Sequence, residues 1–272
     1  MAIMETDTPF ASWKHPFVRE LRGCVKHSRT SILSTEWRHI ARGFSQLVFE
    51  DQPTWSEARF IDVVDHVLSN HGVAIIKFKV SGVGRVDIGA VDRWISRVFD
   101  LSVQELTLRM SHGSEDLFHR ISDRLYTNHQ LTYLHLTSCS LVRPPQAFTG
   151  FRNLKKIVFY RVFMPQGAAN MFFDHCQSLE ELILARIISC AVLYISAPRL
   201  MFLVVSNSFN EITFVNTKRL SHVIIHKLDS PPEATVNGLG NLVKFFSVLP
   251  SVQVLTISGH FMKVYELSLR LV

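Results

Sequence analysis

The chain has 272 residues, of which 47% are hydrophobic and 19% are charged, and this composition excludes an intrinsically disordered protein. No run of about 18 consecutive apolar residues occurs, and residues 1–30 lack the order of basic, apolar and small segments that marks a signal peptide. Four cysteines without a C-x-x-C pair exclude a disulfide framework. We therefore expect a protein without a membrane span that works inside the cell, in the nucleus, the cytoplasm or both.

The positive charge of the chain is concentrated near its N-terminus. Residues 14–42 carry seven lysines and arginines against two glutamates, in a chain whose formal net charge is +6. A basic segment of this kind binds nucleic acid, binds an acidic protein surface or stays solvated, and the sequence alone leaves these alternatives open. The rest of the chain has neither zinc-finger spacing nor an RRM-type aromatic pair, so nucleic-acid binding is the minor alternative.

A short helix is predicted within this basic segment. Apolar residues recur there at helical spacing, namely Ile32, Leu33, Trp37 and Ile40. Ser34 is a suitable N-cap for a helix that carries Trp37. A tryptophan on such a helix either packs into a core or anchors an interface, and both interpretations stay open.

One short pattern recurs along most of the chain: an apolar residue, two variable residues, an apolar residue, one variable residue and an apolar residue. The copies are Val103-Leu106-Leu108, Leu131-Leu134-Leu136, Leu154-Ile157-Phe159, Leu179-Leu182-Leu184, Leu200-Leu203-Val205, Leu220-Val223-Ile225 and Val252-Leu255-Ile257, with an outlying copy at Ile75-Phe78-Val80. Successive copies from Val103 start 20 to 32 residues apart. A period of about 20–29 residues with this internal spacing is typical of leucine-rich repeats.

Each copy of the pattern predicts one short strand. Its last two apolar residues alternate with period two and therefore point to one face of the strand. A single strand cannot bury that face, so we expect the strands of successive repeats to stack in parallel and to cover it. The predicted fold class is α/β, a leucine-rich-repeat solenoid with a parallel sheet on its concave side.

The segments between the strands are expected to form the convex side. Apolar residues at helical spacing predict helices over 92–100, 116–126, 167–177 and 240–249. Pro144-Pro145 predicts an extended return over residues 140–150. The repeats shorten over residues 190–226, which leaves too little chain for a long helix and predicts a nearly all-strand region. Residues 229–240 are an expected exposed loop.

The residues between the inward leucines point to the concave surface, which we interpret as the target-binding face. At the middle outward position, four successive apolar residues form a stripe, and exposed apolar stripes mark interfaces. Aromatic, charged and histidine side chains flank the stripe, a mixture that suits protein binding. The predicted target-binding residues are Tyr133, His135, Val158, Tyr160, Ile183, Phe202, Val204, His222, Ile224 and His226. The alternative is that another segment of the same chain covers the stripe.

Motifs for catalysis do not occur in the sequence. It has no G-x-S-x-G, H-E-x-x-H, P-loop or kinase set, and Gly82 and Gly84 lack the third glycine of a nucleotide-binding loop. His222 and His226 are four residues apart, but on a strand this spacing only places them on one face. We therefore expect a protein that is not an enzyme, with no metal site and no cofactor.

Several motifs resemble a known plant family. Residues 29–38, with Arg29-Thr30-Ser31, Leu33-Ser34 and Trp37-Arg38, are similar to the second half of a plant F-box, and residues 46–51 are similar to the segment after it. The repeats of plant F-box proteins with leucine-rich repeats and an FBD region resemble Ser138-Cys139, Arg143-Pro144-Pro145, Phe148-x-Gly150-Phe151, Cys176 to Glu180, Ile195 to Pro198 and Asn241 to Phe246. The resemblance covers residues 29–265, with little or no FBD region, and residues 1–28 do not match the first half of the F-box.

Members of that family are substrate receptors of SCF-type E3 ubiquitin ligases, in which the F-box docks on a Skp1-like adaptor and the repeats hold the target protein. The resemblance implies a partial F-box-like helical segment over residues 1–50 and the repeat solenoid over residues 51–272. It implies an adaptor-facing or core role for Leu33, Ser34, Trp37 and Arg38, and the basic segment suits an acidic adaptor surface. Because much of the family's adaptor contact lies in the unmatched half, the alternative is a scaffold that binds a target without the adaptor.

Overall fold

The computed structural model describes residues 44–51, 55–83, 87–110, 118–190, 192–206, 211–226 and 252–257. The predicted adaptor residues Leu33, Ser34, Trp37 and Arg38 lie outside the described residues, and so does the basic segment over 14–42. The helix expected over 240–249 and the loop expected over 229–240 also lie outside them.

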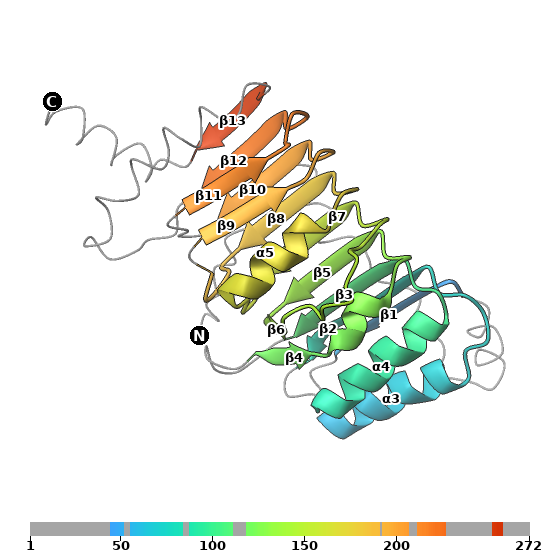
Figure 1. Cartoon of the computed structure of the whole chain (residues 1–272). Coiled ribbons are helices and arrows are strands. Elements are labelled where there is room, and N and C mark those ends of the chain that lie inside the picture. Colours follow the sequence, from blue (N-terminus) through green and yellow to red (C-terminus); the bar gives the residue numbers. More distant parts are fainter. Residues whose placement is uncertain are drawn as a thin grey trace, which may run out of the picture.

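The described residues form a stack of repeats around one long parallel sheet (Figure 1). Every neighbouring pair of its strands is parallel, which confirms the arrangement predicted from the repeat pattern. The nine strands of the sheet are, in spatial and chain order, β1 (Gln46–Glu50), β2 (Lys77–Val83), β3 (Glu105–Met110), β5 (Tyr133–Thr137), β7 (Lys156–Tyr160), β8 (Glu181–Ala185), β10 (Phe202–Ser206), β12 (His222–His226) and β13 (Val254–Ile257).

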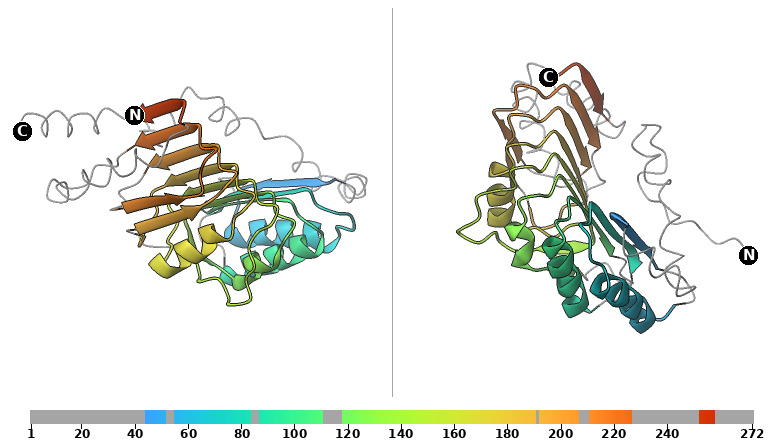
Figure 2. Two further views of the ribbon diagram at one scale, coloured as in Figure 1. Left: turned by 45° about the horizontal axis from the view of Figure 1, so that its top comes forward. Right: turned by 90° about the vertical axis from the view of Figure 1, so that its right-hand side faces the viewer.

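The returning segments contain helices and short strands. The helices are α3 (Glu57–Ser69), α4 (Ile88–Asp100), the 3-10 helix η1 (Asp123–Thr127) and α5 (Gln166–Asp174). Two further parallel pairs join β4 (His119–Ile121) to β6 (Cys139–Leu141) and β9 (Val192–Ser196) to β11 (Glu211–Val215). Figure 2 shows the helices on one face of the nine-stranded sheet, which curves away from them. The opposite face is the concave face. Among the described residues, no helix has both the length and the apolar character needed to cross a lipid bilayer.

The core lies between the sheet and the returning segments. The second residue of each strand from β3 to β12 in this sheet points into the core, and the residues at this position lie in register from strand to strand: Leu106, Leu134, Ile157, Leu182, Leu203 and Val223. All of them are fully buried. Burial of one aliphatic side chain contributes about 1.5–3 kcal/mol to stability. Each repeat is therefore stabilised mainly by the contacts of these inward residues with those of the neighbouring repeats.

Backbone hydrogen bonds join each repeat to the next at the start of its strand. The carbonyl oxygen of Gln104 accepts from the N–H groups of both Thr132, at 2.8 Å, and Tyr133, at 3.2 Å. The carbonyl of Thr132 accepts from Lys155 and Lys156 in the same way. The same sharing continues through the carbonyl groups of Lys155, Glu180, Met201 and Ser221. Because one residue sets the position of two donors, the register of each strand is fixed by the strand before it.

A left-handed turn follows three successive strands of the sheet. Ser138, Arg161 and Arg186 come directly after β5, β7 and β8, with φ of 54°, 52° and 52°. A non-glycine residue adopts this conformation at a cost of about 1–2 kcal/mol. Each N–H group extends the inter-repeat ladder to the last residue of the next strand, at 3.1 Å to Tyr160, 2.8 Å to Ala185 and 2.9 Å to Ser206. These hydrogen bonds offset the strain and turn the chain away from the sheet at the same place in each repeat.

The returning segments agree in part with the predicted elements. Helix α4 contains the predicted 92–100 and begins at Ile88, while α5 ends at Asp174, before the predicted end. Residues 140–150 are non-helical and residues 190–226 form strands, as predicted.

The helix predicted over 116–126 is wrong. His119–Ile121 forms β4 and pairs with β6, and η1 follows it. Ile121 and Leu125 are both buried, so their spacing serves a strand and a 3-10 turn as well as it would serve a helix. The Tyr126 hydroxyl donates to the Val142 carbonyl at 2.6 Å and holds the turn against the next repeat.

Two elements at the N-terminal end of the sheet were not predicted. Strand β1 pairs with β2 and buries Leu47 and Phe49, so the sheet begins inside the segment expected over residues 1–50. Helix α3 buries Phe60, Val64 and Leu68, which are spaced four residues apart. That spacing is a helical signal in the sequence, and it could have predicted this helix.

Gly150 packs closely against His175 at the C-terminal end of α5. Its φ is +100°, and a Cβ atom there would overlap the carbonyl oxygen of His175 and lie 2.8 Å from the His175 Cβ. The neighbouring Phe148 and Phe151 pack on Tyr126, with ring centroids 5.0 and 6.1 Å away. The glycine therefore lets an aromatic cluster approach the end of α5.

We expect Gly150→Ala to lower the free energy of unfolding by about 2–4 kcal/mol, because the added methyl group meets a backbone carbonyl and the φ angle disfavours any side chain. Urea denaturation of the full chain measures this change. Gly167→Ala is the matched control, since Gly167 lies in α5 with open space around its Cα. We expect that control to be neutral or to stabilise by up to about 1 kcal/mol. Equal losses in the two variants would contradict the packing described for Gly150.

Candidate binding surface

The concave face presents three rows of side chains, one row for each outward position of the strands. The first row runs through Lys77, Glu105, Tyr133, Lys156, Glu181, Phe202 and His222. The middle row runs through Lys79, Thr107, His135, Val158, Ile183, Val204 and Ile224. The last row runs through Glu50, Ser81, Arg109, Thr137, Tyr160, Ala185 and Ser206.

The predicted target-binding residues all lie at outward positions of these strands, but their exposure differs. His222 is exposed, whereas Tyr133, Tyr160, Phe202 and Ile224 are half-buried. The buried ones are His135, Val158, Ile183 and Val204. His226 is placed by its backbone alone, as the last residue of β12 paired with Ser206.

The expectation of a solvent-exposed apolar stripe is wrong for the first three of its four residues. Val158, Ile183 and Val204 are only 5%, 1% and 2% exposed, and they form a small apolar cluster of their own. Neighbouring strands in a sheet lie about 4.8 Å apart, so side chains in one row cover each other's flanks. The larger side chains of Tyr133, Phe202 and Ile224 pack against the same cluster. The accessible part of the face is therefore the first row together with Glu50, Arg109, Thr137 and Tyr160 of the last row, since Ser81, Ala185 and Ser206 are also buried.

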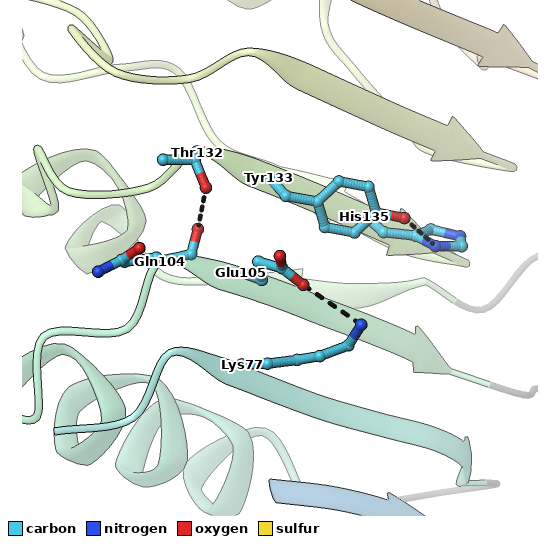
Figure 3. A network of polar contacts seen from close by, with 6 residues as sticks. All are labelled: Lys77, Gln104, Glu105, Thr132, Tyr133 and His135. Carbon is cyan, nitrogen blue, oxygen red and sulfur yellow. Dashed lines mark hydrogen bonds and ion pairs between the residues drawn. The ribbon is translucent and has the colours of Figure 1, made fainter. Parts of the chain in front are cut away.

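Ion pairs across neighbouring strands order the charged part of the face, and Figure 3 shows the one between Lys77 and Glu105. Lys77 pairs with Glu105 at 3.2 Å, and Lys79 pairs with Glu50 at 2.8 Å. Lys156 pairs with Glu181 at 2.8 Å. Partly exposed pairs of this kind contribute about 0–1 kcal/mol each, so their main effect is to fix the direction of the side chains.

His135 lies at the centre of the face, and its ring faces the Tyr133 hydroxyl (Figure 3). Thr137 is the next outward residue of the same strand. The Tyr133 hydroxyl lies 3.4 Å from the Nδ1 atom of His135, and the Thr137 hydroxyl lies 3.3 Å from the Nε2 atom of the same ring. Burial, followed by the positive charges of Arg109, Lys79 and Lys156, lowers the pKa of His135 to about 3. The imidazole is therefore neutral at physiological pH and lies in a region of positive potential.

The cysteines at two places in the described repeats are held as neutral thiols. Burial raises the pKa of the Cys139 thiol to about 12 and that of Cys190 to about 11, so neither forms the reactive thiolate. Within the described ranges, no three His, Cys, Asp or Glu side chains gather as ligands for a metal ion. What remains on the face are hydroxyl groups, rings and ordered charges.

Lys79 and Glu50 were not among the predicted site residues. Lys79 is the outward residue between Phe78 and Val80, in the outlying copy of the repeat pattern. Extending the outward position to this copy would have found it. Glu50 lies in β1, which the pattern did not predict, so its place opposite Lys79 follows only from the structure.

We expect the stability of the chain to fall as the pH decreases from about 6.5 to about 3, because the unfolded state takes up a proton on His135 that the folded state rejects. The slope from this residue is about 1.4 kcal/mol per pH unit. Urea denaturation at several pH values measures it, and His135→Gln is expected to remove this part of the slope. His71, whose pKa is also lowered by burial and by Arg97, is expected to account for a remaining part. An unchanged slope in His135→Gln would contradict the burial described for the imidazole.

Comparison with known proteins identifies the repeats. The family model described as FBD-associated F-box protein At5g56370, LRR repeats, matches residues 91–238, which is more than half of the chain. The matched residues run from α4 to beyond β12 and include most of the concave face. No solved structure matches the chain.

Similar proteins occur in Arabidopsis thaliana. The F-box/FBD/LRR-repeat protein At1g13570 is 28% identical over 234 residues, which cover 83% of this chain and 55% of that protein. The F-box/LRR-repeat protein At3g58900 is 30% identical over 165 residues, which cover 56% of this chain and 50% of that protein. The chain thus spans about half the length of these relatives. The family match and the regular register of the repeats show that the chain belongs to the plant family of F-box proteins with leucine-rich repeats and an FBD region.

Proposed function

We propose that this chain is a substrate-receptor subunit of an SCF-type E3 ubiquitin ligase, whose repeats recruit a target protein for ubiquitination. The observation that carries the proposal is the match of residues 91–238 to the repeats of an F-box protein. F-box proteins of this kind recruit other proteins and do not themselves catalyse a reaction. The proposal places the chain inside the cell, in the nucleus, the cytoplasm or both.

The concave face supports the recruiting role. Tyr133, Tyr160 and Phe202 offer half-buried rings, and His222 offers an exposed one. Rings that lose little conformational freedom on binding are frequent anchors at protein interfaces. The ordered ion pairs beside them suit a partner with a fixed pattern of polar groups.

The adaptor contact is assigned to the partial F-box. By resemblance, Leu33, Ser34, Trp37 and Arg38 face a Skp1-like adaptor or support the surface that does. The basic residues around them suit an acidic adaptor surface. This part of the proposal depends on the sequence resemblance alone.

We expect Trp37→Ala to reduce retention of a Skp1-like adaptor by the full chain at least about tenfold, because a buried tryptophan anchor is worth about 2 kcal/mol or more. Pull-down of the purified adaptor measures the retention. Trp55→Ala is the matched control, since Trp55 is a half-buried ring that packs on Phe60 of α3, outside the F-box match. That control is expected to retain the adaptor fully.

The same experiment tests the alternative of a scaffold that binds a target without the adaptor. For this purpose a chimaera carries a complete F-box from a relative in place of residues 1–43, so that β1 stays paired with β2. Retention by the chimaera with none by the natural chain would remove the ligase part of the proposal and favour the scaffold. Equal retention by Trp37→Ala and the natural chain would contradict the role assigned to Trp37.

A further inference from the structure

In the part of the chain that the structure describes, one cation of the concave face has no carboxylate beside it. In the three rows of the described strands, the charged side chains are Lys77, Lys79, Arg109 and Lys156 on one side and Glu50, Glu105 and Glu181 on the other. The three ion pairs use all the carboxylates and all the lysines. Arg109 is half-buried, and among the residues that the structure describes it has no ion-pair partner.

Hydroxyl groups flank this arginine along the last row. Ser81 of β2 and Thr137 of β5 are its register neighbours on either side, and Tyr160 of β7 follows Thr137. Strands about 4.8 Å apart place Ser81 and Thr137 beside an anion bound at Arg109, whereas Tyr160 lies one strand further on. A hydroxyl can donate a hydrogen bond to an oxyanion, whereas a guanidinium binds a carboxylate with two parallel hydrogen bonds. The last row therefore offers a charged centre between neutral donors.

The surroundings make this place attractive to a negative charge. The neighbouring His135 is buried and carries no charge at neutral pH, and the charges that disfavour its protonation are those of Arg109, Lys79 and Lys156. The positive potential therefore persists at the centre of the face although both lysines are paired.

We propose that Arg109 is the docking point for an aspartate or glutamate side chain in an acidic segment of the target protein. The proposal rests on the proposed function, because it names the class of segment that the repeats recruit. The described rows carry one surplus positive charge, which a single carboxylate neutralises and a phosphate dianion overcompensates. The planar guanidinium also fits a carboxylate in a way that a lysine does not.

The stability of the chain provides a first test of this assignment. A half-buried guanidinium without a partner loses hydration and gains no ion pair, so it does not stabilise the fold. We expect Arg109→Gln to leave the midpoint of thermal unfolding unchanged or to raise it, as is typical of residues retained for binding. A clear decrease would show that Arg109 serves the fold and would overturn the proposal.

A random peptide library displayed on phage is the probe for binding. It is selected on the natural full chain, on Arg109→Gln, on Arg109→Glu and on Arg120→Gln, whose arginine is exposed in β4 away from the concave face. We expect the natural chain and Arg120→Gln to enrich peptides with an acidic residue at one fixed position. Arg109→Gln should lose this preference, and Arg109→Glu should enrich lysine or arginine there.

A selected peptide is then synthesised in three forms, with the acidic residue, with its amide and with phosphoserine at that position. Fluorescence polarisation is expected to show at least about tenfold weaker binding of the amide form to the natural chain, and no difference between the two forms with Arg109→Gln. Selection of neutral peptides, no selection at all, or tight binding of the phosphoserine form alone would overturn the proposal.

The adaptor pull-down separates this inference from the proposed function. Acidic selection that depends on Arg109 without adaptor retention would leave the inference in place and remove the ligase role. Adaptor retention without acidic selection would leave the ligase role in place and remove the inference.

Discussion

The parallel pairing of each strand with its neighbours is the constraint on which the rest of this structure depends. Leu134 and Leu136 occupy one side of a five-residue strand, and that strand alone could not remove them from water. They are fully buried because β3 and β7 lie on either side in exact register. The last described strand shows the reverse case. Leu255 of β13 occupies the same inward position but is 43% exposed, since no described strand follows it. An inward leucine of this fold is therefore fully buried only where neighbouring repeats cover it.

The same constraint explains which elements could be predicted from the sequence. The spacing of inward leucines located every strand from β2 to β13 in the nine-stranded sheet, because that spacing is what the pairing requires. The segments between these strands follow no comparable spacing of apolar residues. Residues 116–126 have apolar residues at helical spacing, yet β4 forms there because β6 offers it a partner. The spacing of Phe60, Val64 and Leu68 could have predicted helix α3. The short strand β1 has no copy of the recurring apolar pattern and could not have been predicted from it.

The concave face was predictable in its composition but not in its contacts. Alternation along each strand assigns Val158, Ile183 and Val204 to the outward side, which the register confirms. Their burial depends on side chains in other repeats, and strand periodicity contains no information about these. The ion pairs pose the same difficulty. Lys77 and Glu105 are far apart in the sequence, and only the register of β2 on β3 makes them neighbours. That Arg109 has no ion-pair partner among the described residues becomes visible only after every pair has been placed.

The buried centre of the face also changes the strength of the charges around it. Side chains in the middle row, from His135 to Val204, exclude water from the floor of the face. Charges that lie beside such a floor are less screened than charges on a fully hydrated surface, so they attract an opposite charge more strongly. Arg109 lies next to this floor in the last row. The positive potential that would hold an acidic side chain there comes from charged residues at outward positions. The residues of the core occupy the inward positions and do not contribute to it. Substitutions in the outward rows can therefore change which partner the repeats bind, while the inward aliphatic residues keep the fold intact.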